Sequence, residues 1–158
     1  MSPAPSPPPG FRPIQAGGGF MAHNGPLYLL HQGELVKLGF RVEQRHCNPM
    51  GMCHGGMLAT FADMLLPLVA HRTAVELAHR FLPTVSLQVD YLAPAAMGEW
   101  VEGQAQVLKV TRAMAFIQGT VTSNGVMALR CSGVFKIGPL METLLASAVP
   151  PGPSASAD

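Results

Sequence analysis

The sequence predicts an α+β domain in which an antiparallel sheet curls around one long, apolar helix. Three observations lead to this fold class. A helical pattern covers residues 55–72, four β-rich segments follow it, and an Asn-Gly pair separates the last two segments. One helix cannot cover both faces of such a sheet, so the economical arrangement wraps the sheet around the helix and pairs exposed edges or faces between subunits.

The composition supports one compact domain with extensive burial. The chain has 158 residues, of which 48% are apolar and 12% are charged, and its formal net charge is +1. This length suffices for one domain with a real core. Because the basic residues are scattered and the net charge is small, we expect binding to neither nucleic acid nor membranes. The longest apolar stretch, residues 64–70, is far too short to span a bilayer.

Both ends of the chain have compositions that disfavour a packed core. Residues 1–21 are rich in proline and glycine, and residues 147–158 are rich in proline, serine and alanine. We therefore expect both segments to be disordered, which leaves residues 22–146 as the folded domain. No signal peptide is expected, because no basic region precedes an apolar core. The three cysteines lack scaffold spacing and are interpreted as reduced thiols in a cytoplasmic protein.

The folded segment is expected to begin with short β elements. Residues 26–30 form a short apolar run, and residues 31–34 have the composition of a turn. Apolar residues alternate with other residues over 38–42, which predicts a strand. The chain then enters a glycine-containing loop over residues 48–56.

The central element is a helix predicted from Gly55 to about Arg72. Apolar residues recur along it at spacings of three and four. A second face, the natural floor of a cleft, carries small or polar residues, namely Gly56, Thr60, Asp63 and Pro67. Pro67 cannot donate a backbone hydrogen bond to the carbonyl of Asp63, so we expect a kink or a looser turn there.

Four strands are predicted after the helix. Apolar and polar residues alternate most clearly over 84–91, and Pro94 ends this strand. Residues 100–110 form the next predicted strand. Residues 113–122 and 126–137 flank the Asn-Gly pair, which is the strongest short-range signal for a β-hairpin.

The segment from Asn48 to Gly56, together with Asp63, carries the strongest functional signal. Free N–H groups at a helix start attract developing negative charge, and two glycines let a substrate approach the backbone. A carboxylate two turns inside an apolar helix is difficult to explain by solvation, because buried carboxylates are rare unless they are paired or catalytic. Together these features suggest acyl transfer, with an oxyanion site and a nearby acid or base.

These motifs resemble a known family. The pattern Asn48-x2-Gly51-x2-His54-Gly55-Gly56-x6-Asp63, followed by the strand at 84–92 and Pro94, is similar to the hotdog-fold acyl-CoA thioesterases. The most similar branch is the phenylacetic-acid-degradation type, and the resemblance covers roughly residues 35–137. It implies a dimer of dimers that hydrolyses acyl-CoA thioesters to a free acid and CoA, with each active site between two protomers.

The resemblance also implies roles for individual residues. Asp63 matches the family's catalytic carboxylate, which acts as general base or nucleophile. Gly55 matches the residue whose N–H polarises the thioester carbonyl, and His54 matches the position that fixes this loop. Asn48 matches an asparagine that positions the attacking water or the substrate, and Thr84 falls near the same water. Asp63 would then face Asn48 and Gly55 of the neighbouring protomer.

The residues expected to bind the rest of the substrate have less specific signals. Gly56 belongs to the glycine pair that lets the substrate approach the loop. The phosphates of CoA favour a basic cleft mouth, for which the candidates are Arg72, Arg80 and Arg112. Each of these arginines also has the simpler interpretation of a solvated surface charge.

Alternative interpretations remain open for several of these residues. Asn48 could stabilise only its own turn, Thr84 could be an ordinary strand residue, and the carboxylate of Asp63 could be satisfied by backbone donors or Thr60. A metal cluster could be built from His46, Cys47, Cys53 and His54, but the spacing lacks a paired C-x2-C form. We therefore expect no metal and no cofactor.

Two rival functions are considered. The first is a hotdog hydratase or dehydratase, whose sites typically pair a catalytic histidine with a carboxylate in a different motif. The second is a non-catalytic acyl-CoA-binding module, which would need no carboxylate in the cleft. Asp63, inside the helix that follows His54, favours hydrolysis over both.

Overall fold

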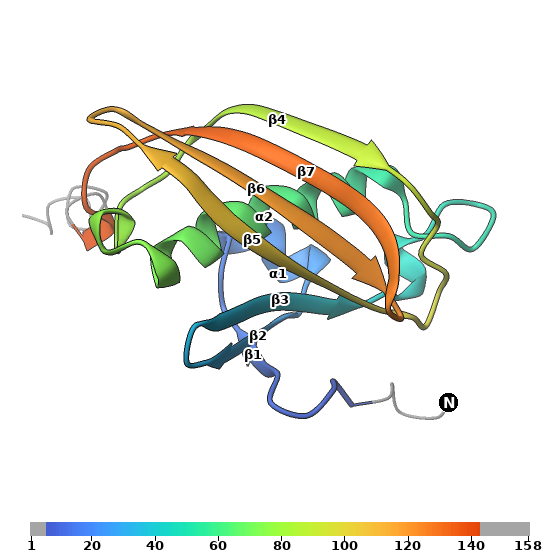
Figure 1. Ribbon diagram of the computed structural model, residues 1–158. Helices are drawn as coiled ribbons and strands as arrows, with labels where there is room; N and C mark the ends of the chain where they lie inside the picture. Colours follow the sequence, from blue (N-terminus) through green and yellow to red (C-terminus); the bar gives the residue numbers. More distant parts are fainter. Residues whose placement is uncertain (1–5, 143–158) are drawn as a thin grey trace, which may run out of the picture.

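The computed structural model describes residues 6–142, within which seven antiparallel strands form one sheet around one long helix (Figure 1). This confirms the α+β class and the hotdog arrangement that the resemblance implies. The elements are β1 (Arg12–Ile14), α1 (Gly18–Asn24), β2 (Leu27–Gln32), β3 (Leu35–Arg41), the 3-10 helix η1 (Gln44–His46), α2 (Gly55–Thr73), the 3-10 helix η2 (Val75–Leu77), β4 (Thr84–Tyr91), β5 (Trp100–Val110), β6 (Met114–Ser123) and β7 (Val126–Lys136).

The sheet order places the strand that follows the long helix at an edge. The order is β1-β2-β3-β5-β6-β7-β4, and every neighbouring pair is antiparallel. α2 lies across the inner face of the sheet, as Figure 1 shows. β4 pairs with β7 on one side, and within residues 6–142 no strand pairs with its other side. This free edge lies next to α2, where the site residues are found.

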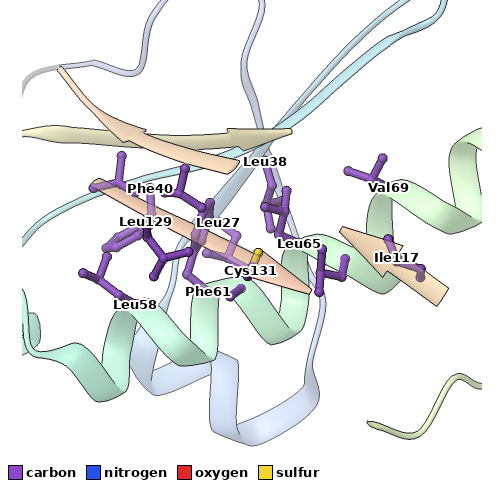
Figure 2. Close-up of a cluster of buried hydrophobic side chains, with 14 of the residues drawn as sticks. Leu27, Leu38, Phe40, Leu58, Phe61, Leu65, Val69, Ile117, Leu129 and Cys131 are labelled. Atoms are coloured by element: carbon purple, nitrogen blue, oxygen red, sulfur yellow. The ribbon is translucent and has the colours of Figure 1, made fainter. Parts of the chain in front are cut away.

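The core lies between α2 and the inner face of the sheet. Leu58, Phe61, Leu65 and Val69 recur at helical spacing and point toward apolar side chains of the strands (Figure 2). The ring of Phe61 lies 5.0 Å from that of Phe40 in β3. Burial of one such side chain contributes about 1.5–3 kcal/mol. Because the sheet curls around the helix, the buried face of α2 is wider than the single apolar stripe expected from the sequence.

Two strand glycines allow α2 to pack closely against the sheet. A Cβ atom on Gly103 in β5 would lie 2.5 Å from Leu65, and one on Gly133 in β7 would lie 3.0 Å from Leu66. Side chains at these positions would push the helix away from the sheet. The glycines therefore help to set the depth at which α2, and with it Asp63, lies in the fold.

The Asn-Gly hairpin forms as predicted. Asn124 and Gly125 have φ angles of 45° and 83°, which are the positive values that a tight two-residue hairpin turn requires. β5 spans the predicted residues 100–110, and β6 and β7 agree with their predicted ranges to within about one residue.

The helix α2 continues through Pro67 and ends at Thr73. Pro67 removes one backbone hydrogen bond, to the carbonyl of Asp63, but Val69 and Ala70 beyond it are buried against the sheet. This packing explains why the helix does not end at the proline. Among residues 6–142, α2 and the other helices all fall short of the length and apolarity that crossing a membrane requires.

The N-terminal segment differs from the sequence prediction. Residues 1–21 were expected to be disordered, but Arg12–Ile14 form β1 against β2, and α1 begins at Gly18. Phe11 packs edge-on against Trp100 with ring centres 5.0 Å apart, and Met21 is buried. Composition could not reveal these contacts, because they join a few apolar side chains to residues far away in the sequence. The predicted tail at 147–158 lies outside the described residues.

Candidate active site

The first turn of α2 is held by His54, the residue directly before it. Its ring Nδ1 accepts a hydrogen bond from Gly56 N–H at 2.9 Å, and its carbonyl accepts from Met57 and Leu58 N–H at 2.9 and 3.1 Å. Because Nδ1 is an acceptor, the neutral ring carries its proton on Nε2. His54 thus fixes the loop at the helix start, and its other ring nitrogen is a donor rather than a base.

Gly55 N–H is the first-turn donor that has no acceptor among residues 6–142. The next three N–H groups, those of Gly56, Met57 and Leu58, all donate to His54. A helix start carries partial positive charge, and an N–H left unpaired there is suited to a carbonyl oxygen that gains negative charge. The structure therefore leaves available the same N–H that the sequence assigns to the thioester.

Tyr91, the last residue of β4, covers this turn and is absent from the sequence prediction of the site. Its hydroxyl donates to Gly55 O at 2.8 Å, and a Cβ atom on Gly55 would lie 3.4 Å from its ring. In the sequence, Tyr91 is recognisable only as an alternating residue of a strand. That β4 passes the start of α2 is a property of the tertiary structure.

The side chain of Asn48 stabilises its own loop. Its Oδ1 accepts hydrogen bonds from Met50 N–H at 2.9 Å and from Met52 N–H at 3.2 Å. This is the turn-stabilising alternative that the sequence left open. The Nδ2 group makes no hydrogen bond to another described residue, so it stays available as a donor beside the start of α2.

Asp63 and Thr84 are brought together from α2 and β4. Thr84 Oγ1 donates to Asp63 Oδ1 at 2.6 Å, a short bond of the kind that hydroxyl groups make to charged carboxylates. Asp63 is half-buried and Thr84 is exposed, so the carboxylate borders the surface along the free edge of β4. The resemblance implies that Thr84 lies near the attacking water, and the structure places its hydroxyl group against Asp63.

Asp63 and Gly55 do not meet within one chain. They are separated by eight positions on the same helix, which at the rise of an α-helix corresponds to about 12 Å along the axis. The two halves of the predicted site therefore lie at different points along α2. Because β4 runs beside the helix, it contacts both points: Thr84 bonds to Asp63, and Tyr91 bonds to Gly55.

The three candidate arginines lie at the end of the domain away from Gly55. Arg72 is exposed in the last turn of α2, and Arg112 is exposed in the turn between β5 and β6. Arg80 is half-buried and its guanidinium donates to Gly138 O at 3.5 Å. The backbone of Ile137 donates to Ala113 O at 2.8 Å, which connects the regions of Arg80 and Arg112. None of the three contacts the start of α2.

His46 holds the loop before α2, a role that the sequence prediction missed. It is 3% exposed, its Nδ1 accepts from Glu43 N–H at 3.0 Å, and its Nε2 donates to Asn24 O at 3.0 Å. Its carbonyl accepts from His54 N–H at 2.7 Å. Both ring nitrogens are thus occupied by backbone partners. The spacing Glu43-x2-His46, which forms a reciprocal cap of η1, is the one signal that could have revealed this role.

Acidification is expected to weaken the fold through His46. Burial lowers the pKa of His46 below its ordinary value of 6.5, and the charge of Arg45 acts in the same direction. Below about pH 6.5, His46 therefore becomes protonated more readily in the unfolded chain than in the folded chain. The free energy of unfolding consequently falls as the pH falls further. His46→Gln is expected to flatten this decline in urea unfolding at pH 7.5 and 5.5 (values chosen on either side of the histidine range).

His31→Gln serves as the matched control, because His31 lies exposed near the end of β2. This variant is expected to keep the pH dependence of the unmodified protein. Equal slopes for the unmodified protein and His46→Gln would contradict the assignment to His46.

A cavity of about 390 Å³ lies between α1 and the first turn of α2. Its walls include Phe20, His54, Gly56, Met57 and Thr60. The position of α1, which the sequence did not predict, thus creates a hollow beside the first turn of α2.

Comparison with known proteins identifies the family. The family model described as thioesterase superfamily matches residues 50–128, half of the chain. A Pseudomonas aeruginosa protein named as a candidate esterase is 32% identical over 132 residues, covering 82% of this chain and 96% of its own length. Human acyl-coenzyme A thioesterase 13 is 32% identical over 95 residues, covering 59% of this chain and 64% of its own length.

A solved structure with a similar fold supports the same family assignment as the two sequence relatives. A variant of the phenylacetic acid degradation protein PaaI from Thermus thermophilus aligns with a TM-score of 0.61 and 26% identity, covering 75% of this chain and 97% of that protein. The region matched by the family model contains most of the loop, the whole of α2 and the strands β4, β5 and β6. The chain therefore belongs to the thioesterase superfamily and is a thioester hydrolase of the hotdog fold.

Proposed function

We propose that this protein hydrolyses acyl-CoA thioesters to a free acid and CoA, with Gly55 N–H binding the thioester carbonyl and Asp63 carrying the reaction. The observation that carries the proposal is the N–H of Gly55 at the start of α2, which has no acceptor among residues 6–142, in a turn whose other donors are all satisfied by His54. The human relative named an acyl-coenzyme A thioesterase supports the choice of substrate class.

The proposed site is completed by a second copy of the chain. Gly55 and Asp63 are separated by about 12 Å along α2, so one protomer cannot place both against one thioester carbon. The free edge of β4 carries Thr84 and Tyr91 beside these two residues, and Val85 on the same strand is 58% exposed. In a two-fold dimer formed along this edge, Asp63 of one protomer would face Gly55 and Asn48 of the other. A homodimer or a dimer of dimers is therefore proposed.

In the proposed reaction, Gly55 N–H stabilises the oxyanion that forms on the carbonyl oxygen. One such preorganised donor is worth about 2.7–4 kcal/mol. The Asp63 carboxylate either removes a proton from the attacking water or attacks the carbonyl itself and forms an anhydride that water then cleaves. Thr84 holds the carboxylate through its 2.6 Å hydrogen bond, and CoA leaves as the thiolate.

The remaining predicted residues have supporting roles in this proposal. His54 orients the loop, since its Nδ1 already accepts from Gly56 N–H and cannot serve as the base. The Asn48 Nδ2 group is available to donate to water or substrate. Arg72, Arg80 and Arg112 lie away from Gly55 of their own chain, so in the proposed dimer they would meet the phosphates of CoA from the protomer that supplies Asp63.

A thiol-release assay tests the proposal. The purified protein is supplied with a panel of acyl-CoA esters that have aromatic, medium-chain and long-chain acyl groups, and released CoA is trapped by a chromogenic disulfide. We expect stoichiometric release of CoA and acid from at least one class. Binding of acyl-CoA without release from any of them would favour the rival binding module.

Thr84→Val is expected to lower kcat about tenfold, because hydrogen bonds to charged groups are typically worth about 1.5–3 kcal/mol and this one borders solvent. Valine keeps the branched shape of the side chain but cannot donate to Asp63. Thr84→Ser keeps the hydroxyl and should restore most of the rate. A defect of equal size in both variants would indicate that the methyl group, and not the hydrogen bond, matters.

A further inference from the structure

Two thiols face each other at the base of the loop that leads into α2. Cys47 and Cys53 form an isolated antiparallel bridge. Two backbone hydrogen bonds flank this pair, Asn48 N–H to Met52 O at 2.8 Å and His54 N–H to His46 O at 2.7 Å. Because these bonds flank the two cysteines and do not join them, the pair is of the non-hydrogen-bonded kind, in which opposed Cα atoms are about 4.5 Å apart.

This spacing suits a disulfide bond. Disulfides join Cα atoms about 4.4–6.8 Å apart, and directly opposed residues of an antiparallel pair project their side chains to the same side. Both cysteines pack against the same core cluster. The backbone of Cys53 is also held from its other side, where its N–H donates to Ala95 O at 2.7 Å. Cross-linking therefore requires rotation of the two side chains and only a small local adjustment of the backbone.

The two thiols differ in access. Cys47 is half-buried, donates weakly to Glu43 O at 3.3 Å and lines the 390 Å³ cavity, so a small oxidant can reach it. Cys53 is 6% exposed, and burial raises its pKa to about 12, so it remains a neutral thiol at physiological pH. Because Cys47 is the more accessible of the two, it is the thiol that meets the oxidant, and Cys53, which faces it across the bridge, is the one placed to resolve the product.

We propose that Cys47 and Cys53 form an oxidative modification site, in which a hydroperoxide converts the facing thiols into a reversible disulfide that lowers turnover at the adjoining site. The Cys47 sulfur attacks one oxygen of hydrogen peroxide, the O–O bond breaks, and a sulfenic acid and water form. The Cys53 sulfur then attacks the Cys47 sulfur, the S–O bond breaks, and the departing hydroxide takes the Cys53 proton to form a second water. The thiols lose two electrons and two protons in total, and the peroxide gains them.

The cross-link acts on the site through its neighbours in the chain. Cys47 directly precedes Asn48, and Cys53 directly precedes His54, whose ring and carbonyl hold the first turn of α2. Turning Cys47 toward Cys53 breaks its contact with Glu43 O and draws the two sides of the loop together. A displacement of catalytic groups by about 1 Å can cost as much as 100-fold in rate. The effect on turnover rests on the proposed function, whereas the cross-link itself does not.

Mass spectrometry of the full-length protein tests the cross-link. The protein is treated with hydrogen peroxide, its free thiols are alkylated, and it is digested. We expect the peptide that contains Cys47 and Cys53 to lose two hydrogen atoms and take up no alkyl group, and dithiothreitol to restore both thiols. Sulfinic acid at Cys47 in place of this product, or a cross-link between two chains, would overturn the proposal.

Cysteine variants make the test specific. Cys47→Ser and Cys53→Ala are each expected to abolish the product. Cys131→Ser is the matched control and should leave it unchanged, because Cys131 is equally buried but lies in β7 and donates to Gly119 O at 3.6 Å. A product that survives Cys53→Ala would contradict the assignment.

The rate of acyl-CoA hydrolysis gives the second readout. Oxidised protein is expected to show a kcat lower by about tenfold or more, and dithiothreitol should restore it. The Cys47→Ser variant cannot form the disulfide, so peroxide should leave its kcat unchanged. A disulfide that forms without a change in rate would overturn the effect on turnover. Absence of hydrolysis by the reduced protein would contradict the proposed function instead, and the mass measurement would still decide the cross-link.

Discussion

Replacing Asp63 with asparagine is expected to lower kcat by about 10²–10⁴-fold, the range that removal of a general base or acid typically costs. Asparagine has the same size and can still accept the hydrogen bond from Thr84, but it cannot take a proton or attack a thioester. Because this interaction is made in the transition state, kcat and kcat/KM should fall together. Steady-state kinetics of thiol release measures both constants.

The matched control for Asp63→Asn is Asp90→Asn. Asp90 is also bound to a single described partner, with its Oδ2 2.6 Å from Arg130 Nε, but this side chain is 58% exposed on β4. Exposed ion pairs contribute little to stability, so Asp90→Asn should keep the rate and the melting temperature. Full activity in Asp63→Asn would remove the carboxylate from the proposed mechanism.

Replacing Gly55 with leucine is expected to lower kcat/KM by about 10²–10³-fold, the loss associated with one oxyanion donor. The N–H itself remains, but a Cβ atom would already lie 3.4 Å from the Tyr91 ring, and the longer side chain would occupy the approach to the turn. Gly19→Leu is the control, because a Cβ atom on Gly19 meets nothing within 4 Å. Unchanged kinetic constants in Gly55→Leu would contradict the carbonyl-binding role.

Mixing these two inactive variants tests whether the site is shared between protomers. In a mixed dimer of Asp63→Asn with Gly55→Leu, one site would combine the intact Asp63 of one chain with the intact Gly55 of the other. Random exchange at equal concentrations should then restore about a quarter of the full activity, because half of the dimers are mixed and half of their sites are intact. If exchange of subunits is demonstrated and no activity returns, the shared site is excluded.

The elements that the sequence predicted correctly are those with a strong local signal. Helical spacing of apolar residues revealed α2, strict alternation revealed β4, and the Asn124-Gly125 pair revealed the last hairpin. Each signal arises from the geometry of neighbouring residues, so it is readable without knowledge of the fold. The resemblance singled out both Thr84 and Asp63, but their direct hydrogen bond is visible only in the structure.

The elements that the sequence did not reveal depend on distant partners. β1 and α1 lie in a segment whose composition indicates disorder, and their order comes from pairing with β2 and from the burial of Phe11 and Met21. Tyr91 reaches the site through its hydrogen bond to Gly55 O, and His46 is anchored beside the site by its hydrogen bond to Asn24 O. No local pattern reports which distant carbonyl a side chain will meet.

By itself, the sequence determined the class of fold and the limits of α2, because residue spacing and side-chain type specify these properties locally. The tertiary structure decided which donor remains unpaired, which strand lies at the free edge, and that Cys47 faces Cys53. These facts depend on how the sheet curls around the helix, and that curvature results from packing among residues that the sequence separates widely.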